Sequence, residues 1–169
     1  MDAQHPFMEQ ALALARCSIG RSEPNPRVGC VIVAADGRRV LGEGSTQPAG
    51  QPHAEIMALR DAASRGHSVE GATVYVTLEP CSHHGRTGPC ADRIIAAGIR
   101  RVVAAMEDPF PQVNGRGFVR LREHGIEVMV GVGRECAVRL NQPFLTSVRQ
   151  QRPFVILSPL CHPEPALSS

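Results

Sequence analysis

Apolar residues recur along this chain at two spacings, one helical and one extended, and glycine or proline separates most of the runs. The N-terminal segment repeats apolar side chains every three or four positions from Phe7 to Ile19, which predicts a helix that Gly20 would end. Val28 to Ala35 is a continuous apolar run and predicts a buried strand, followed by the hairpin signal Asp36-Gly37. By the same criteria we expect helices at 53–65, 90–97 and 116–124 and one from 135 that Pro143 splits, with strands at 39–44, 73–78, 101–106, 126–130 and 154–157.

Strands that alternate with helices through short turns favour an α/β layered fold. The alternation extends over residues 1–157, which we interpret as one domain. From Ser158 onward the composition changes to proline, serine and small residues, so we expect a disordered tail at 158–169.

The amino-acid composition excludes several kinds of catalytic site and argues against some binding partners. All 18 of the residues counted as Lys or Arg are arginine, which excludes a Schiff-base lysine or a lysine-dependent phosphate loop. A formal charge of +2 gives little attraction to nucleic acid or to a membrane surface. The six cysteines come without an export signal, so we expect reduced thiols and a cytoplasmic protein.

The informative residues are His53, Glu55, Cys81 and Cys90, with Pro80 before the first cysteine. One imidazole and two thiolates suit zinc, and three protein ligands leave the fourth tetrahedral position for water. Zinc lowers the pKa of such a water toward neutrality. A carboxylate nearby that does not bind the metal can move its proton, which is the pattern of zinc nucleobase deaminases. A structural zinc site or a pair of buried thiols is the alternative, but neither needs Glu55.

Eight residues separate Cys81 from Cys90, where the simple deaminase signature has two. With this insert, the segments 25–29, 53–55 and 77–87 resemble the deaminase domain of the bifunctional riboflavin-biosynthesis deaminase–reductase. The resemblance implies a cytidine deaminase-like three-layer α/β/α sandwich with a central mixed sheet, and a homodimer. It also implies a small-molecule substrate, 2,5-diamino-6-ribosylamino-4(3H)-pyrimidinone 5′-phosphate, that loses its 2-amino group as ammonia.

Residue roles also follow from this resemblance. His53, Cys81 and Cys90 would hold Zn²⁺, and Glu55 would transfer protons. The positions where the family meets its substrate are occupied here by Asn25, Thr46, His83, Arg86, Asp108 and Phe110.

Two of those positions depart from the family pattern. Thr46 replaces a histidine, and Phe110 replaces the asparagine of Asp-Pro-Asn-Pro. The nicotinamide-binding reductase half of that family is not found in this chain, which leaves open whether a separate reductase is its partner. These departures leave open a second hypothesis, a diverged deaminase of another pyrimidine, a pterin or a guanine-like ring.

A deaminase that edits nucleic acid is a further alternative. It would need a basic channel lined by aromatic residues to hold a flipped base. The chain has no tryptophan, 4% aromatic residues and a charge of +2. We therefore expect neither nucleic-acid nor membrane binding.

Overall fold

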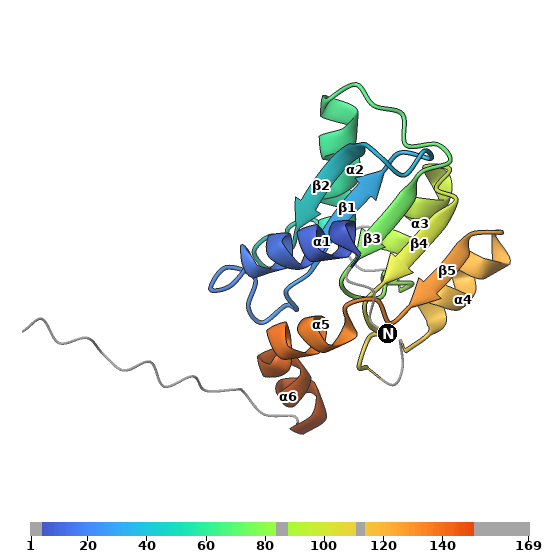
Figure 1. The fold of residues 1–169 in the computed structure, drawn as a ribbon. Coiled ribbons are helices and arrows are strands. Elements are labelled where there is room, and N and C mark those ends of the chain that lie inside the picture. Colours follow the sequence, from blue (N-terminus) through green and yellow to red (C-terminus); the bar gives the residue numbers. More distant parts are fainter. Residues whose placement is uncertain (1–4, 84–87, 111–113, 151–169) are drawn as a thin grey trace, which may run out of the picture.

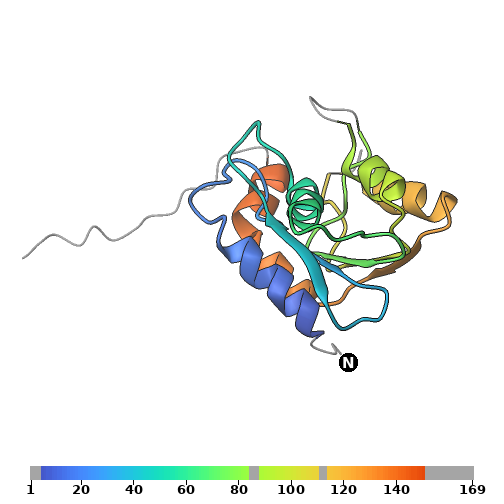
Figure 2. The same ribbon diagram turned by 90° about the horizontal axis from the view of Figure 1, so that it is seen from above.

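Five strands form one sheet between two layers of helices in the computed structural model, which describes residues 5–83, 88–110 and 114–150 (Figures 1 and 2). The strands are β1 (Gly29–Val33), β2 (Val40–Ser45), β3 (Thr73–Val76), β4 (Arg101–Ala104) and β5 (Glu127–Val130). The helices are α1 (Pro6–Arg16), α2 (Ala54–Ser64), α3 (Cys90–Ala96), α4 (Arg116–Glu123), α5 (Arg134–Leu140) and α6 (Gln142–Gln150). Helices α2, α3 and α4 cover one face, and α1 covers the other with α5 beside it. The predicted three-layer sandwich is confirmed.

The predicted elements within the described residues are all present, with ends that differ by a few positions. Ile19 was expected on the apolar face of the first helix, and this is wrong: α1 ends at Arg16 and Ile19 is 51% exposed. Pro143 lies just inside α6, where the missing amide hydrogen is not needed, and the chain forms two helices there. The expected strand at 154–157 and the tail at 158–169 lie outside the described residues.

The sheet is mixed, and its strand directions decide where the site forms. The order is β2-β1-β3-β4-β5, with β1 antiparallel to both of its neighbours and β3, β4 and β5 parallel. Pairing of Cys30 with Val76 places the start of β1 beside the end of β3. The ends of β2 and β4 lie at this same edge, because Ser45 pairs with Gly29 and Ala104 pairs with Val76.

Two glycines allow helices to pack unusually close to this edge. A Cβ atom on Gly29 would lie 1.8 Å from the carbonyl oxygen of Ala11 in α1. On the opposite face, a Cβ on Gly44 would lie 2.3 Å from the carbonyl oxygen of Ala54 at the start of α2. Any side chain at either position would push a helix away from the sheet. The glycine in β2 therefore sets how close the N-terminus of α2 comes to the strand ends.

The buried carboxylate of Glu79 fastens the loop after β4 to the segment after β3. Its side chain is 4% exposed, and its oxygens accept backbone N–H groups from Asp108 at 3.0 Å, Gly115 at 2.9 Å and Gly117 at 2.8 Å. Three charge-assisted bonds satisfy the buried carboxylate. They also fix Asp108 and the beginning of α4 relative to Pro80, whose carbonyl touches Gly117.

No helix in the three described stretches combines the length and the apolar character that a bilayer span requires.

We predict that Glu79→Gln lowers the free energy of unfolding by about 1–3 kcal/mol, because the new amide group faces backbone donors that need an acceptor. Urea unfolding of the zinc-loaded protein measures the change, with Glu70→Gln at an exposed position as the matched control. Equal stability of the two variants would contradict the role given to Glu79.

Candidate metal centre and substrate cavity

The three predicted metal ligands come together at the edge of the sheet from three separate elements. His53 is the N-cap of α2, Cys90 is the first residue of α3, and Cys81 follows β3. The Nδ1 atom of His53 lies 3.7 Å from the Cys81 sulfur and 3.2 Å from the Cys90 sulfur. All three ligand atoms lie within 4.8 Å of one another. Ligands of one tetrahedral zinc ion are separated by about 3.5–4 Å, so the cluster fits zinc.

The charge distribution of the two thiols supports the same assignment. The Cys90 thiol donates a hydrogen bond to the Cys81 sulfur, which lowers the pKa of Cys81 to about 4 and raises that of Cys90. The backbone N–H of Cys90 also donates to the Cys81 sulfur at 3.2 Å. A hydrogen bond with Cys81 raises the pKa of His53. A sulfur that is already anionic beside a second thiol is suited to binding a soft divalent cation.

Glu55 lies one residue inside α2, beside this cluster but outside the ligand set. Its side chain is 4% exposed. Burial raises the pKa of Glu55 to about 7, with a further contribution from the negative charge on Cys81. A carboxyl group with such a pKa can both accept and release a proton near neutral pH.

A cavity of about 240 Å³ opens in front of the cluster. Its lining includes eight residues that the sequence analysis selected: Asn25, Thr46, His53, Glu55, Cys81, His83, Asp108 and Phe110. Arg86 lies outside the described residues. One cavity is thus lined by two of the candidate ligands, His53 and Cys81, by the candidate proton carrier Glu55, and by the candidate substrate contacts that the structure describes.

Two of the candidate substrate-binding residues, Thr46 and Asp108, make interactions with other parts of the fold that the sequence alone could not predict. The hydroxyl of Thr46 accepts the backbone N–H of Val28 at 3.0 Å, so this side chain also fastens the start of β1 to the end of β2. Burial raises the pKa of Asp108. The hydrogen bond from the Phe110 N–H and the nearby His83 act in the opposite direction, but their effect on the pKa is smaller.

The cavity also contains Leu78, Glu79 and Phe144, which the sequence analysis did not select as site residues. Glu79 lies in segment 77–87, which carries the family resemblance, so the sequence could have indicated its place near the site. Phe144 is on α6, far from every motif in the sequence, and its ring packs edge-on against Phe110 with centroids 6.2 Å apart. Nothing in the local sequence around Phe144 indicates this position.

Several known proteins are similar in sequence to most of this chain, including the residues that form the cluster and the cavity. The Escherichia coli riboflavin biosynthesis protein RibD is 54% identical over 151 residues, which are 89% of this chain and 40% of that protein. The Synechocystis RibD is 50% identical over 156 residues, covering 92% of this chain and 41% of its own. The chain therefore spans about 40% of the length of these relatives.

Solved structures show the same likeness in three dimensions. A Thermotoga maritima diaminohydroxyphosphoribosylaminopyrimidine deaminase/5-amino-6-(5-phosphoribosylamino)uracil reductase has a TM-score of 0.83 and 48% identity, over 88% of this chain and 42% of that one. The Aspergillus oryzae Rib2 deaminase in complex with DARIPP has a TM-score of 0.60 and 25% identity, over 81% and 96% of the two chains. The family model of the cytidine and deoxycytidylate deaminase zinc-binding region matches residues 1–106 of the 169. The cluster, the fold and this match agree, and the chain belongs to the cytidine and deoxycytidylate deaminase zinc-binding family.

Proposed function

We propose that this chain is a zinc-dependent hydrolytic deaminase of riboflavin biosynthesis. Its substrate is 2,5-diamino-6-ribosylamino-4(3H)-pyrimidinone 5′-phosphate, and its products are the corresponding 5-amino-6-ribosylaminouracil phosphate and ammonia. The observation that carries the proposal is the buried carboxylate of Glu55 beside the His53, Cys81 and Cys90 cluster, at a cavity of about 240 Å³. About 50% identity to RibD proteins supports the choice of substrate.

His53, Cys81 and Cys90 would hold the zinc ion, which when bound supplies Lewis-acid activation of a water molecule. Glu55 accepts a proton from the water as its oxygen adds to C2 of the ring. Glu55 delivers this proton to the ring nitrogen whose double bond to C2 opens on addition. It then moves the remaining proton of the added hydroxyl to the 2-amino group, the exocyclic C2–N bond breaks, and ammonia leaves. The ring retains the oxygen as a carbonyl. Water supplies every atom gained by the two products, so the reaction needs no oxidant or reductant.

The substrate contacts form the second part of the proposal. Asn25, His83 and Asp108 line the cavity beside Glu55 and supply amide, imidazole and carboxyl groups for the polar edge of the ring. Arg86, in the insert between the cysteines, is proposed to bind the phosphate, because a guanidinium group can grip phosphate oxygens in pairs.

The reaction also implies a following step. The product is an aminouracil, and the Thermotoga maritima relative combines its deaminase with an aminouracil reductase. We infer that a reductase of this class consumes the product.

A second candidate function, the deamination of another pyrimidine, a pterin or a guanine-like ring, is favoured by two observations at the cavity. Thr46 has its hydroxyl bonded to the backbone of Val28, and Phe110 contributes an apolar ring at the cavity. Both features reduce the number of cavity groups that can form hydrogen bonds with the substituents of a substrate ring. A different set of substituents would then be preferred.

Ammonia release from a panel of compounds separates these two functions. We predict that kcat/KM for the ribosylaminopyrimidine phosphate exceeds that for cytidine, deoxycytidylate, guanine and a pterin by at least about 100-fold, because a site built for specific polar groups rejects rings that leave those groups unpaired. Release from guanine or the pterin, without release from the nucleotide, would establish the second function instead.

We predict that Glu55→Gln lowers kcat by about 1,000-fold and leaves the zinc content unchanged, because the amide keeps the shape of the side chain but cannot carry the proton. Steady-state ammonia release and metal analysis measure the two effects. Glu9→Gln, at an exposed position of α1, is the matched control. Turnover at the wild-type rate in Glu55→Gln would refute the assigned role.

A further inference from the structure

We propose that Phe110 and Phe144 form an aromatic wall that binds the planar ring of the substrate. The inference rests on the proposed function, since the ring in question is the aminopyrimidine. It assigns binding of the ring to a pair of residues that lie on different elements, one after β4 and one on α6.

The two rings are placed to act together at the cavity. Both line it, together with His53 and Glu55. Their centroids are 6.2 Å apart and their planes meet at 60°, the edge-to-face arrangement that aromatic side chains prefer. Phe110 is 45% exposed although it is a large apolar residue. A flat heterocycle that enters the cavity would cover part of this surface, and its burial favours binding.

The backbone of Phe110 is held by hydrogen bonds on both sides of the residue. Its N–H donates to the Asp108 carboxylate at 2.9 Å, and its carbonyl accepts the N–H of Asn114 at 2.8 Å. Glu79 binds the N–H groups of Asp108 and Gly115 on either side of this turn. These bonds hold the backbone at Asp108 and Phe110, so the attachment point of the exposed ring loses little conformational freedom when a ligand binds.

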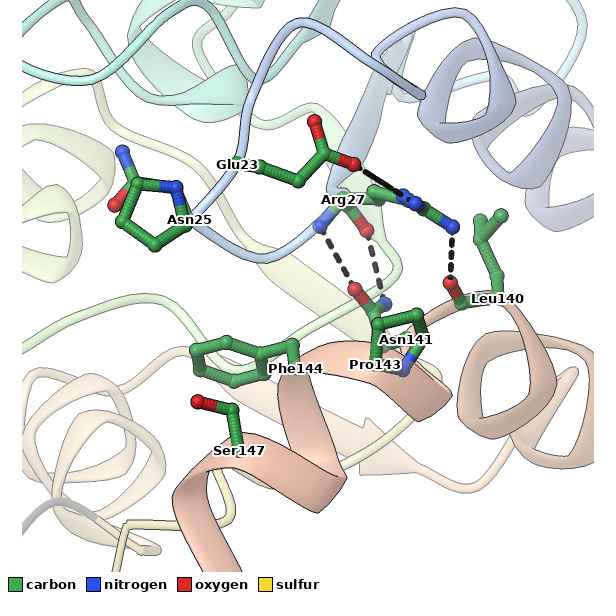
Figure 3. A pocket seen from close by; sticks show the side chains of 9 residues that line it. Glu23, Asn25, Arg27, Leu140, Asn141, Pro143, Phe144 and Ser147 are labelled. Carbon is green, nitrogen blue, oxygen red and sulfur yellow. Dashed lines mark hydrogen bonds and ion pairs between the residues drawn. The ribbon is translucent and has the colours of Figure 1, made fainter. Parts of the chain in front are cut away.

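The position of Phe144 is set by a clamp between the start of α6 and the segment before β1. Asn141 is 1% exposed, accepts the N–H of Arg27 at 2.7 Å and donates to the Arg27 carbonyl at 2.9 Å. The Arg27 guanidinium bonds the carbonyl of Leu140 at 3.1 Å and Glu23 at 2.8 Å (Figure 3). The clamp holds α6 against the segment that contains Asn25.

Phe144 and Asn25 stand at the boundary between two cavities. Both line the cavity of the metal cluster, and both line a second one of about 230 Å³ next to the clamp, shown in Figure 3. The clamp thus determines how far the Phe144 ring reaches toward Glu55 and the ligands. A planar ring with its polar edge at Glu55 and Asp108 would have its face available to the two aromatic rings, which is the geometry of π contact.

The test compares Phe110→Leu, Phe144→Leu and the double variant, each of which keeps an apolar side chain but removes the aromatic face. Phe7→Leu is the matched control, since Phe7 packs with His5 and Tyr75 in an aromatic cluster outside the described lining of the cavity. Zinc content and the thermal midpoint of every variant are measured first. KM and kcat for the ribosylaminopyrimidine phosphate follow, together with calorimetric binding of the free base, 2,5,6-triaminopyrimidin-4-one.

We predict that each single cavity variant raises KM and the Kd of the free base by about threefold to tenfold, while kcat changes by less than about twofold. The effects of the double variant should not be multiplicative, because the two rings touch each other. Binding and KM indistinguishable from those of Phe7→Leu would overturn the proposal.

Failure of this proposal and failure of the proposed function give different results. If the wild type releases ammonia from the nucleotide but the cavity variants match the control, the wall is refuted and the function stands. If the wild type releases no ammonia from the nucleotide but binds the free base, and the cavity variants do not bind it, the proposed function is refuted and the aromatic wall is supported.

Discussion

The antiparallel pairing of β1 with β3 is the constraint on which the site depends. Because β1 runs against β3, the chain enters the sheet beside the point where β3 leaves it. The segment with Asn25 therefore faces the segment with Cys81, although they are far apart in sequence. The hairpin to β2 brings the chain back to this same edge, and Gly44 then lets the start of α2 approach it closely. His53 and Glu55 reach the cavity through that approach.

Burial is the second physical element of the site. Two carboxylates, Glu55 and Glu79, are each 4% exposed, but their surroundings differ. Glu79 is satisfied by three backbone N–H groups and has a structural role. Glu55 lies beside an anionic sulfur, and its pKa of about 7 keeps it able to exchange a proton. The same residue type thus serves as a fixed anchor in one position and as a proton carrier in the other, because of what surrounds each carboxylate.

Sequence reasoning predicted the elements and the metal cluster because their signals are local. Apolar periodicity identified the strands and helices, and the spacing from His53 to Glu55 and the two cysteines indicated one zinc site. The contacts that it could not predict join distant positions. Asn141 and Arg27 are separated by 114 residues, and the three amides bound by Glu79 belong to Asp108 after β4 and to the start of α4, 29 to 38 positions along the chain from Glu79. Phe144 and Phe110 lie on elements that are distant in sequence and meet at the cavity, so their proximity is a property of the tertiary fold.

We propose that a three-ligand zinc site with one buried carboxylate makes this chain a deaminase. Titration of the metal-free protein with zinc, with ammonia release from the ribosylaminopyrimidine phosphate as the readout, tests it most directly. We expect the activity to rise in proportion to added zinc and to reach a plateau when zinc equals the protein concentration. Zinc bound at that ratio without ammonia release, or release that is independent of zinc, would contradict the proposal.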